Sequence, residues 1–284
     1  MEDIDHLETD DGYAELPQEI WEQIASCLPL NDLLSLSGAS HGLHDRFGVE
    51  VETQEALETA LAHPSLTFIV VKGSGLTVAG YPVSGARILA AGDIHLAVSA
   101  GCVHVRETVH VDIGGDAQVY AYDQALVTAH GKARVRAAGQ VQVSAHDKAR
   151  VSAFGQAQVT AHDRANVLAT DQALVTAHGQ ARVRAAGQVQ VSAHDRAHVL
   201  ASSQAQVTAH DRAHVGATDS ALVTAHDQAD IVAYRQAQVS VHDRAGVIAY
   251  DDNHVIVHDQ ARVYAGPRAH VDRMPDPGQQ DSVQ

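Results

Sequence analysis

The sequence predicts a mainly β fold: a two-sided parallel β-solenoid of 16-residue coils with a small α-helical module at its N-terminus. Three observations lead to this prediction. An eight-residue pattern recurs over residues 115–274, histidines close every second copy of it, and the segment before residue 50 has apolar residues at helical spacing. With 45% hydrophobic but only 4% aromatic residues, the core must be thin and built from small side chains.

The chain begins with a strongly acidic stretch, and residues 1–12 are predicted to be a disordered leader. Residues 1–60 hold 15 acidic residues and one base, Arg46, whereas the other 224 hold 20 acids and 18 bases. The excess of acidic residues in 1–60 disfavours nucleic acid and anionic membrane as partners. Without a signal-like or membrane-spanning apolar stretch, we expect a cytoplasmic protein, or one of the host cytosol if it is a secreted bacterial effector.

Residues 13–50 are predicted to form a compact helical module. Pro17 suits the first position of a helix, and one face of that helix carries Ile20, Ile24 and Leu28. Asn31 can cap a second short helix and Ser40 a third.

This module resembles the F-box, with Leu16, Pro17, Glu19, Ile20, Ile24, Leu28, Asp32, Leu33, Leu36 and Ser40 at that family's spacing. The resemblance implies docking onto a Skp-type adaptor of a cullin-based ubiquitin ligase, with the C-terminal repeat selecting an unknown substrate protein. The adaptor-binding residues that it implies are Leu16, Pro17, Ile20, Ile24, Leu28, Leu33 and Leu36. Gly42 and Leu43 depart from the family, which usually has a basic residue and a tryptophan there. A plain capping bundle is the alternative.

Residues 51–114 are predicted to be a helical cap followed by degenerate first coils. The segment 53–63 is compatible with a helix, and residues 66–73 resemble a strand. A solenoid must cover its open sheet edges, which otherwise recruit other chains.

Residues 115–274 repeat the octad D-x-A-x-V-x-A-x. Its third, fifth and seventh positions are apolar and its fourth and sixth mostly polar, so each octad is a strand with one buried face. Histidines recur every 16 residues and indicate two octads per coil: His130, His146, His162, His178, His194, His210, His226, His242 and His258. A three-sided coil of 24 residues remains the alternative. Residues 123–146 and 171–194 are nearly identical at an offset of 48, and both 16 and 24 divide this offset.

Stacked coils turn these columns into ladders. An Asp column follows the histidines, a Lys/Arg column follows the Asp residues, and a Gln column at the other corner can form an amide ladder. We interpret all of them as structural. Residues 275–284 are predicted to be a disordered tail.

One outer face is irregular, and irregular positions are where a partner can be recognised. The candidate partner face comprises Arg134, Arg136, Arg150, Arg182, Arg184, His198, His214 and Tyr264. No catalytic residues are expected, because every candidate Asp, His or Ser belongs to a column of equivalents. No metal or cofactor is expected, because the histidine column lacks a set of three or four converging ligands. We therefore expect a non-enzymatic binding scaffold, an F-box-type adaptor. The alternative is a structural, ice-binding or self-assembling solenoid, similar to bacterial ice-nucleation repeats, with the N-terminal helices as a cap.

Overall fold

The computed structural model describes residues 48–64, 66, 68–82 and 86–274. These residues fall into two compact units. The first unit comprises the described residues up to Gly73 and those within Tyr81–Leu89. The second unit comprises Ser74–Gly80 and the described chain from Ala90 onward. The strand β4 (Arg87–Ala90) passes from the first unit into the second.

The first unit contains α4 (Gln54–Ala62), the one helix in the described part of the chain. Thr53 caps it, since its Oγ1 accepts a hydrogen bond from the Ala56 amide at 3.2 Å. The helix buries Leu57 and Ala60 and contacts two parallel strands, β1 (Gly48–Val51) and β2 (Phe68–Val71). It lies within 53–63, where the sequence predicted a helix. The helices predicted before residue 48 lie outside the described residues.

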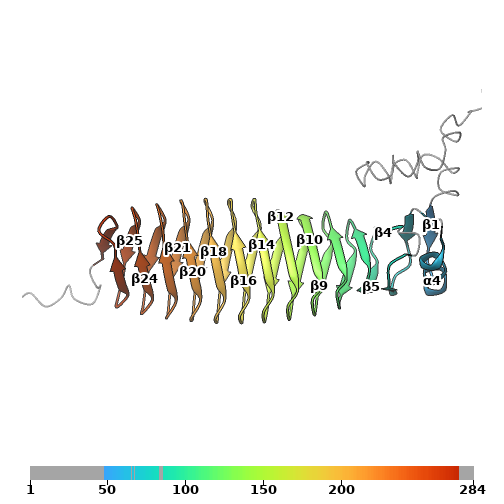
Figure 1. Cartoon of the computed structure of the whole chain (residues 1–284), viewed down its shortest axis with the longest axis horizontal. Helices are drawn as coiled ribbons and strands as arrows, with labels where there is room; N and C mark the ends of the chain where they lie inside the picture. Colours follow the sequence, from blue (N-terminus) through green and yellow to red (C-terminus); the bar gives the residue numbers. More distant parts are fainter. Residues whose placement is uncertain (1–47, 65, 67, 83–85, 275–284) are drawn as a thin grey trace, which may run out of the picture. The chain divides into compact units, whose positions relative to one another are not determined.

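The second unit consists of two parallel sheets, whose strands lie side by side along it (Figure 1). Within the second unit, the strands of the even sheet are β6 (Cys102–Val105), β8 (Gln118–Ala121), β10 (Arg134–Gly139), β12 (Arg150–Gly155), β14 (Asn166–Ala169), β16 (Arg182–Ala185), β18 (His198–Ala201), β20 (His214–Ala217), β22 (Asp230–Ala233), β24 (Gly246–Ala249) and β26 (Arg262–Ala265). The strands of the odd sheet are β3 (Leu76–Ala79), β5 (His95–Ala100), β7 (His110–Ile113), β9 (Leu126–Ala129), β11 (Gln142–Ala145), β13 (Gln158–Ala161), β15 (Leu174–Ala177), β17 (Gln190–Ala193), β19 (Gln206–Ala209), β21 (Leu222–Ala225), β23 (Gln238–Val241), β25 (His254–Val257) and β27 (His270–Arg273).

The strand register confirms the 16-residue coil. Arg134 pairs with Arg150 in the even sheet and Gln142 with Gln158 in the odd sheet, each 16 residues on. A three-sided coil would pair residues 24 apart, so that alternative is wrong. The offset differs near the start of the unit, where β3 pairs with β5 (Leu76 with Leu96) and β5 with β7 (His95 with His110).

The core lies between the two sheets and is as thin as the composition predicts. The third, fifth and seventh octad positions are buried from Ala117 to Val257, as at Ala125, Val127 and Ala129, which are at most 2% exposed, whereas Val263 and Ala265 of the terminal coil are not buried. Small side chains allow the two sheets to approach closely. Asn253 stands at a third position and is the one buried polar residue of the described chain; its Nδ2 donates to the Ala233 carbonyl at 2.9 Å.

Two corners turn each coil. The His corner follows an odd-sheet strand, as at 130–132, and the Gln corner follows an even-sheet strand, as at 122–124. At both corners the first octad residue has a positive φ, +60° at Asp123 and +65° at Gly131. Glycine adopts this region freely, and Asp does so more readily than most residues. This requirement explains why the octads begin with Asp or Gly.

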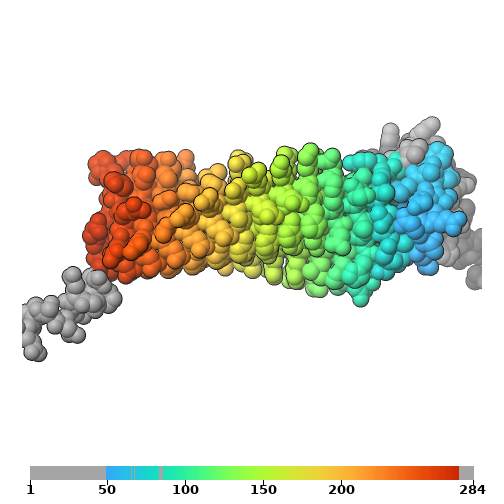
Figure 2. Space-filling view, turned by 90° about the horizontal axis from the view of Figure 1, so that it is seen from below, coloured from blue at the N-terminus to red at the C-terminus, as the bar shows by residue number. Residues whose placement is uncertain are grey.

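The Asp carboxylates also join successive coils. The amide of Gly131 donates to Asp147 Oδ2 at 3.0 Å, and the amide of Asp195 donates to Asp211 Oδ2 at 3.0 Å. The same bond forms at the Gln corner, from the Gly155 amide to Asp171 Oδ2 at 3.0 Å. Each Asp therefore satisfies a backbone donor of the preceding coil, so this column is structural. Because every coil repeats the same turn, residues 16 apart form columns along the second unit. Figure 2 shows the coils of this unit following one another in sequence order, from cyan to red.

Candidate partner-binding groove

A groove of about 530 Å³ follows the even sheet beside the His corner. Most of its lining side chains are basic, and their columns run along the second unit. The lining residues are Asp116, Lys132, Arg134, Lys148, Arg150, Arg164, Asn166, Gln180, Arg182 and His198. We call this surface the basic groove.

Two neighbouring outward columns supply the six cations of the basic groove. Lys132, Lys148 and Arg164 stand at the second octad position, in the His corner, and Arg134, Arg150 and Arg182 stand at the fourth, where the strand begins. The buried alanine between these positions means that both neighbours point outward. Successive coils lie one strand spacing, about 4.8 Å, apart. The groove thus brings like charges from neighbouring coils together.

All six cations are exposed, and within the described part of the chain none of them forms an ion pair. Arg164 Nε donates instead to Gln180 Oε1 at 3.2 Å. Asp116 is the acidic residue of the lining. Because unpaired like charges at this spacing repel one another, a ligand with several negative charges is favoured here.

The structure divides the predicted partner face. Arg134, Arg150, Arg182 and His198 line the basic groove, and Arg136 instead has its guanidinium 5.1 Å from the centre of the Phe154 ring. The others lie on the same sheet but outside the lining: Arg184 on β16, His214 on β20 and Tyr264 on β26. His214 stacks on His198 at a centroid separation of 5.0 Å. Tyr264 is 73% exposed.

Sequence reasoning missed the contribution of the corner lysines and of Arg164. The sequence analysis interpreted their Lys/Arg column as structural, whereas the structure places these residues beside the arginines of the sheet. The signal was available, since two positions that flank a buried residue face the same side of a strand.

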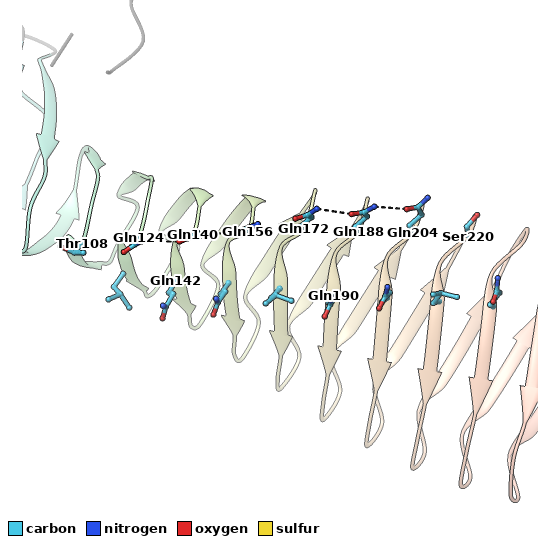
Figure 3. Close-up of a pocket in the computed structure, with 16 residues that line it drawn as sticks. Thr108, Gln124, Gln140, Gln142, Gln156, Gln172, Gln188, Gln190, Gln204 and Ser220 are labelled. Atoms are coloured by element: carbon cyan, nitrogen blue, oxygen red, sulfur yellow. Dashed lines mark hydrogen bonds between the residues drawn. The ribbon is translucent and has the colours of Figure 1, made fainter. Parts of the chain in front are cut away.

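The Gln corner forms the amide ladder that the sequence predicted. Gln172 Nε2 donates to Gln188 Oε1, and Gln188 Nε2 donates to Gln204 Oε1, each at 3.4 Å (Figure 3). The ladder borders a second groove, of about 1120 Å³, shared with outward residues of the odd sheet such as Gln142 and Gln190. This groove carries amides and leucines and has no charged lining residue in the described chain.

The His corner stacks its imidazoles into a continuous column from His130 to His258. Neighbouring ring centroids lie 4.1 to 5.3 Å apart, as between His242 and His258 and between His162 and His178. Burial lowers the pKa of His162 and His194, and the neighbouring imidazoles of the column lower it further. Face-to-face stacking directs the ring nitrogens sideways rather than toward a common point.

Three serines contact the column. Ser192 Oγ lies 2.8 Å from His194 Nε2, and equivalent pairs form at Ser144 with His146 and at Ser240 with His242, each at 3.0 Å. A nucleophilic site needs a serine beside an imidazole base, but these three pairs are copies at equal intervals in a ladder. The expectation of a non-enzymatic protein stays a prediction.

The predicted adaptor-binding residues lie outside the described residues. They are Leu16, Pro17, Ile20, Ile24, Leu28, Leu33 and Leu36. Their role therefore stays a prediction based on the F-box resemblance.

Comparisons of the chain with protein-family models, with curated proteins and with solved structures find no match. In the described residues, no helix has the length and apolar character needed to cross a membrane. The parallel two-sheet solenoid of 16-residue coils is thus established by its own register.

Proposed function

We propose that this protein is a non-enzymatic binding scaffold whose basic groove holds an acidic segment of a partner protein. The observation that carries the proposal is the set of six exposed cations without ion pairs in one groove. Arginine binds carboxylates through a planar fork of donors, and neighbouring coils offer several such forks in a row. An extended peptide with repeated Asp or Glu matches this arrangement.

A protein partner fits the groove better than a nucleic acid does. Single-stranded nucleic acids bind where aromatic side chains interleave with the bases, and the described lining contains no phenylalanine, tyrosine or tryptophan.

The test is binding of a fluorescein-labelled glutamate-rich peptide to the full chain, followed by fluorescence anisotropy at low salt. We expect the charge-reversal variant Arg134→Glu/Arg150→Glu/Arg182→Glu to weaken binding by about a hundredfold or more, since each pair contributes about 1 kcal/mol. A matched control, Arg196→Glu/Arg212→Glu/Arg244→Glu, makes the same charge change at the His corner outside the groove. Equal weakening in both variants would show a net-charge effect and reject the groove. Stronger binding of a single-stranded oligonucleotide than of the peptide would reject a protein partner.

We further propose that residues 16–47 dock the scaffold onto a Skp-type adaptor in the cytoplasm, so that the partner protein becomes a ubiquitin-ligase substrate. This second part of the proposal is supported by the F-box resemblance alone. A pull-down with a purified Skp-type adaptor compares the wild type with Leu16→Ala/Ile24→Ala. We expect the variant to lose the adaptor, and equal recovery of both proteins, or of neither, contradicts the proposal.

The predicted alternative, an ice-binding or self-assembling solenoid, is separated from the scaffold by two measurements on the same full chain. An ice-binding protein produces thermal hysteresis, and a self-assembling one forms filaments visible by electron microscopy. The scaffold is expected to show neither.

A further inference from the structure

The C-terminal end of the odd sheet gathers three metal-binding side chains. His254 on β25 and His270 on β27 are direct partners in the register, and Asp272 follows His270 by two residues. Residues two apart in a strand face the same side, so all three side chains project from the outer surface of the sheet. Their ligand atoms lie within 4.8 Å of one another.

Asp272 lies between the two imidazoles and contacts both. Its Oδ2 is 2.8 Å from His254 Nε2, and its Oδ1 is 3.2 Å from His270 Nε2. The hydrogen bond with His254 lowers the pKa of this carboxyl, and His270 lowers it further, so the carboxylate is charged at neutral pH. The group therefore offers one anionic oxygen and two imidazole nitrogens.

This arrangement differs from that of the corner histidines. Rings in the corner column are nearly parallel, with 8° between His242 and His258, whereas 40° separates the rings of His254 and His270. The tilt and the shared carboxylate direct the nitrogens toward one point. Within the described part of the chain, this is the one group of three His, Cys, Asp or Glu side chains with converging ligand atoms.

We propose that His254, His270 and Asp272 form a binding site for a divalent transition-metal ion such as Zn²⁺. Metal–ligand distances for imidazole and carboxylate are about 2.0 to 2.2 Å, so ligand atoms separate by roughly 3 to 3.5 Å around a tetrahedral ion. Small side-chain rotations bring the three atoms to that spacing. Two imidazoles and a carboxylate suit Zn²⁺, Ni²⁺ and Cu²⁺ better than Mg²⁺ or Ca²⁺, which prefer all-oxygen ligands.

The ion joins the last strand of the odd sheet to its neighbour. β27 ends the strand order of that sheet, so its other edge has no partner strand in the described chain. Coordination by one residue of β25 and two of β27 crosslinks these strands, and it stabilises the folded state by an amount that grows with the logarithm of the free metal concentration above Kd. Loss of the ion therefore loosens the terminal coil.

The site is tested by calorimetric titration of the full chain with Zn²⁺ and by the visible absorption of bound Co²⁺. We expect one site per chain, with the Kd raised about tenfold or more by His254→Ala and by Asp272→Asn. Asp272 is about half exposed, so its amide variant is expected to fold normally, which circular dichroism checks. His198→Ala is the matched control, since it removes an outward histidine of a stacked pair on the other sheet.

Unfolding temperature provides the second measurement. Zn²⁺ is expected to raise the unfolding temperature of the wild type and of His198→Ala but not that of Asp272→Asn. Equal Zn²⁺ affinity in the wild type, His254→Ala, Asp272→Asn and His198→Ala overturns the proposal. A loss of affinity in His194→Ala as large as in His254→Ala also overturns it, because it assigns the metal to the corner column. Because the basic groove is on the other sheet, peptide binding is expected to be unchanged in Asp272→Asn.

Discussion

The His corner and the Gln corner turn the chain in the same way but stack different side chains. Both place a residue with positive φ at the first octad position, and at both an Asp carboxylate accepts the amide of the preceding coil. The His corner then stacks imidazole rings, 5.0 Å apart between His194 and His210. The Gln corner joins its side-chain amides by hydrogen bonds of 3.3 to 3.5 Å, as between Gln140 and Gln156 and between Gln124 and Gln140.

The difference shows that turning and stacking are separate tasks. Backbone conformation and the Asp bond make the turn, while the neighbouring ladder decides how the corner responds to its surroundings. Imidazoles take up protons near neutral pH, whereas side-chain amides do not. We therefore expect the His corner, and not the Gln corner, to respond to mildly acidic pH.

The largest effect is expected from disturbing the turn itself. Asp211→Val at the His corner and Asp171→Val at the Gln corner each force a β-branched residue into a positive φ, near +57° and +62° respectively. They also remove the bond from the preceding amide. We expect each to lower the free energy of unfolding by about 2 to 3 kcal/mol, measured by urea denaturation.

Glycine at the same position separates the two causes. Asp211→Gly keeps the positive φ, as Gly179 does two coils earlier in the same His-corner column, and loses only the carboxylate. We expect a cost of about 1 kcal/mol. A glycine variant as unstable as the valine variant would show that the carboxylate, and not the backbone conformation, dominates the turn.

The second effect is acid destabilisation through the His corner. The pKa values of His162, His194 and His242 are lowered from 6.5, first by burial and then by neighbouring imidazoles, while nearby Asp carboxylates oppose this. The unfolded chain thus binds more protons than the folded chain as the pH falls through 6.5. The stability that these neutral imidazoles contribute is complete above pH 6.5 and is lost as the pH falls through their lower folded-state pKa values. We expect the unfolding temperature to fall between about pH 7.5 and about pH 5.

Replacing imidazoles by amides tests whether this response belongs to the His corner. The variant His162→Gln/His194→Gln/His242→Gln is expected to lose a large part of the pH dependence, since amides do not titrate. The control Gln140→Ala/Gln188→Ala alters the other corner and is expected to keep the wild-type slope of unfolding temperature against pH. Identical slopes in all three proteins would assign the response to groups outside the corner column.

The smallest effect is expected from breaking the amide ladder. Gln188→Ala removes two hydrogen bonds, one to Gln172 and one to Gln204, at an exposed corner. Water replaces both bonds, so we expect a loss of about 0.5 to 1 kcal/mol in the free energy of unfolding by urea. A loss as large as that of Asp171→Val would mean that the ladder, and not the turn, holds the Gln corner.

The regular coils were predictable because one short pattern determines them. Alternation at Ala125, Val127 and Ala129 defines the buried face, and the interval between His130 and His146 defines the coil. The first coils were less predictable, since their octads are degenerate and the offset changes to 15 residues between His95 and His110.

The candidate sites were predictable only in part. Arg134, Arg150 and Arg182 were identified because they lie on the irregular outer face. Lys132 and Lys148 were not, because membership of a regular column suggested a structural role alone. The group of His254, His270 and Asp272 was also missed, although an interval of 16 residues and a His-x-Asp spacing were its signals.

The sequence by itself determined the two-sided coil, the buried Ala and Val columns, and the ladders, because a repeat imposes the same local choice on every coil. Only the tertiary structure decided which side chains act together. Stacking places residues 16 apart beside one another, and side-chain direction then pairs, stacks or separates them. Thus one histidine column stacks ring on ring, whereas His254 and His270 converge on a carboxylate. That difference depends on side-chain orientation, which spacing alone does not specify.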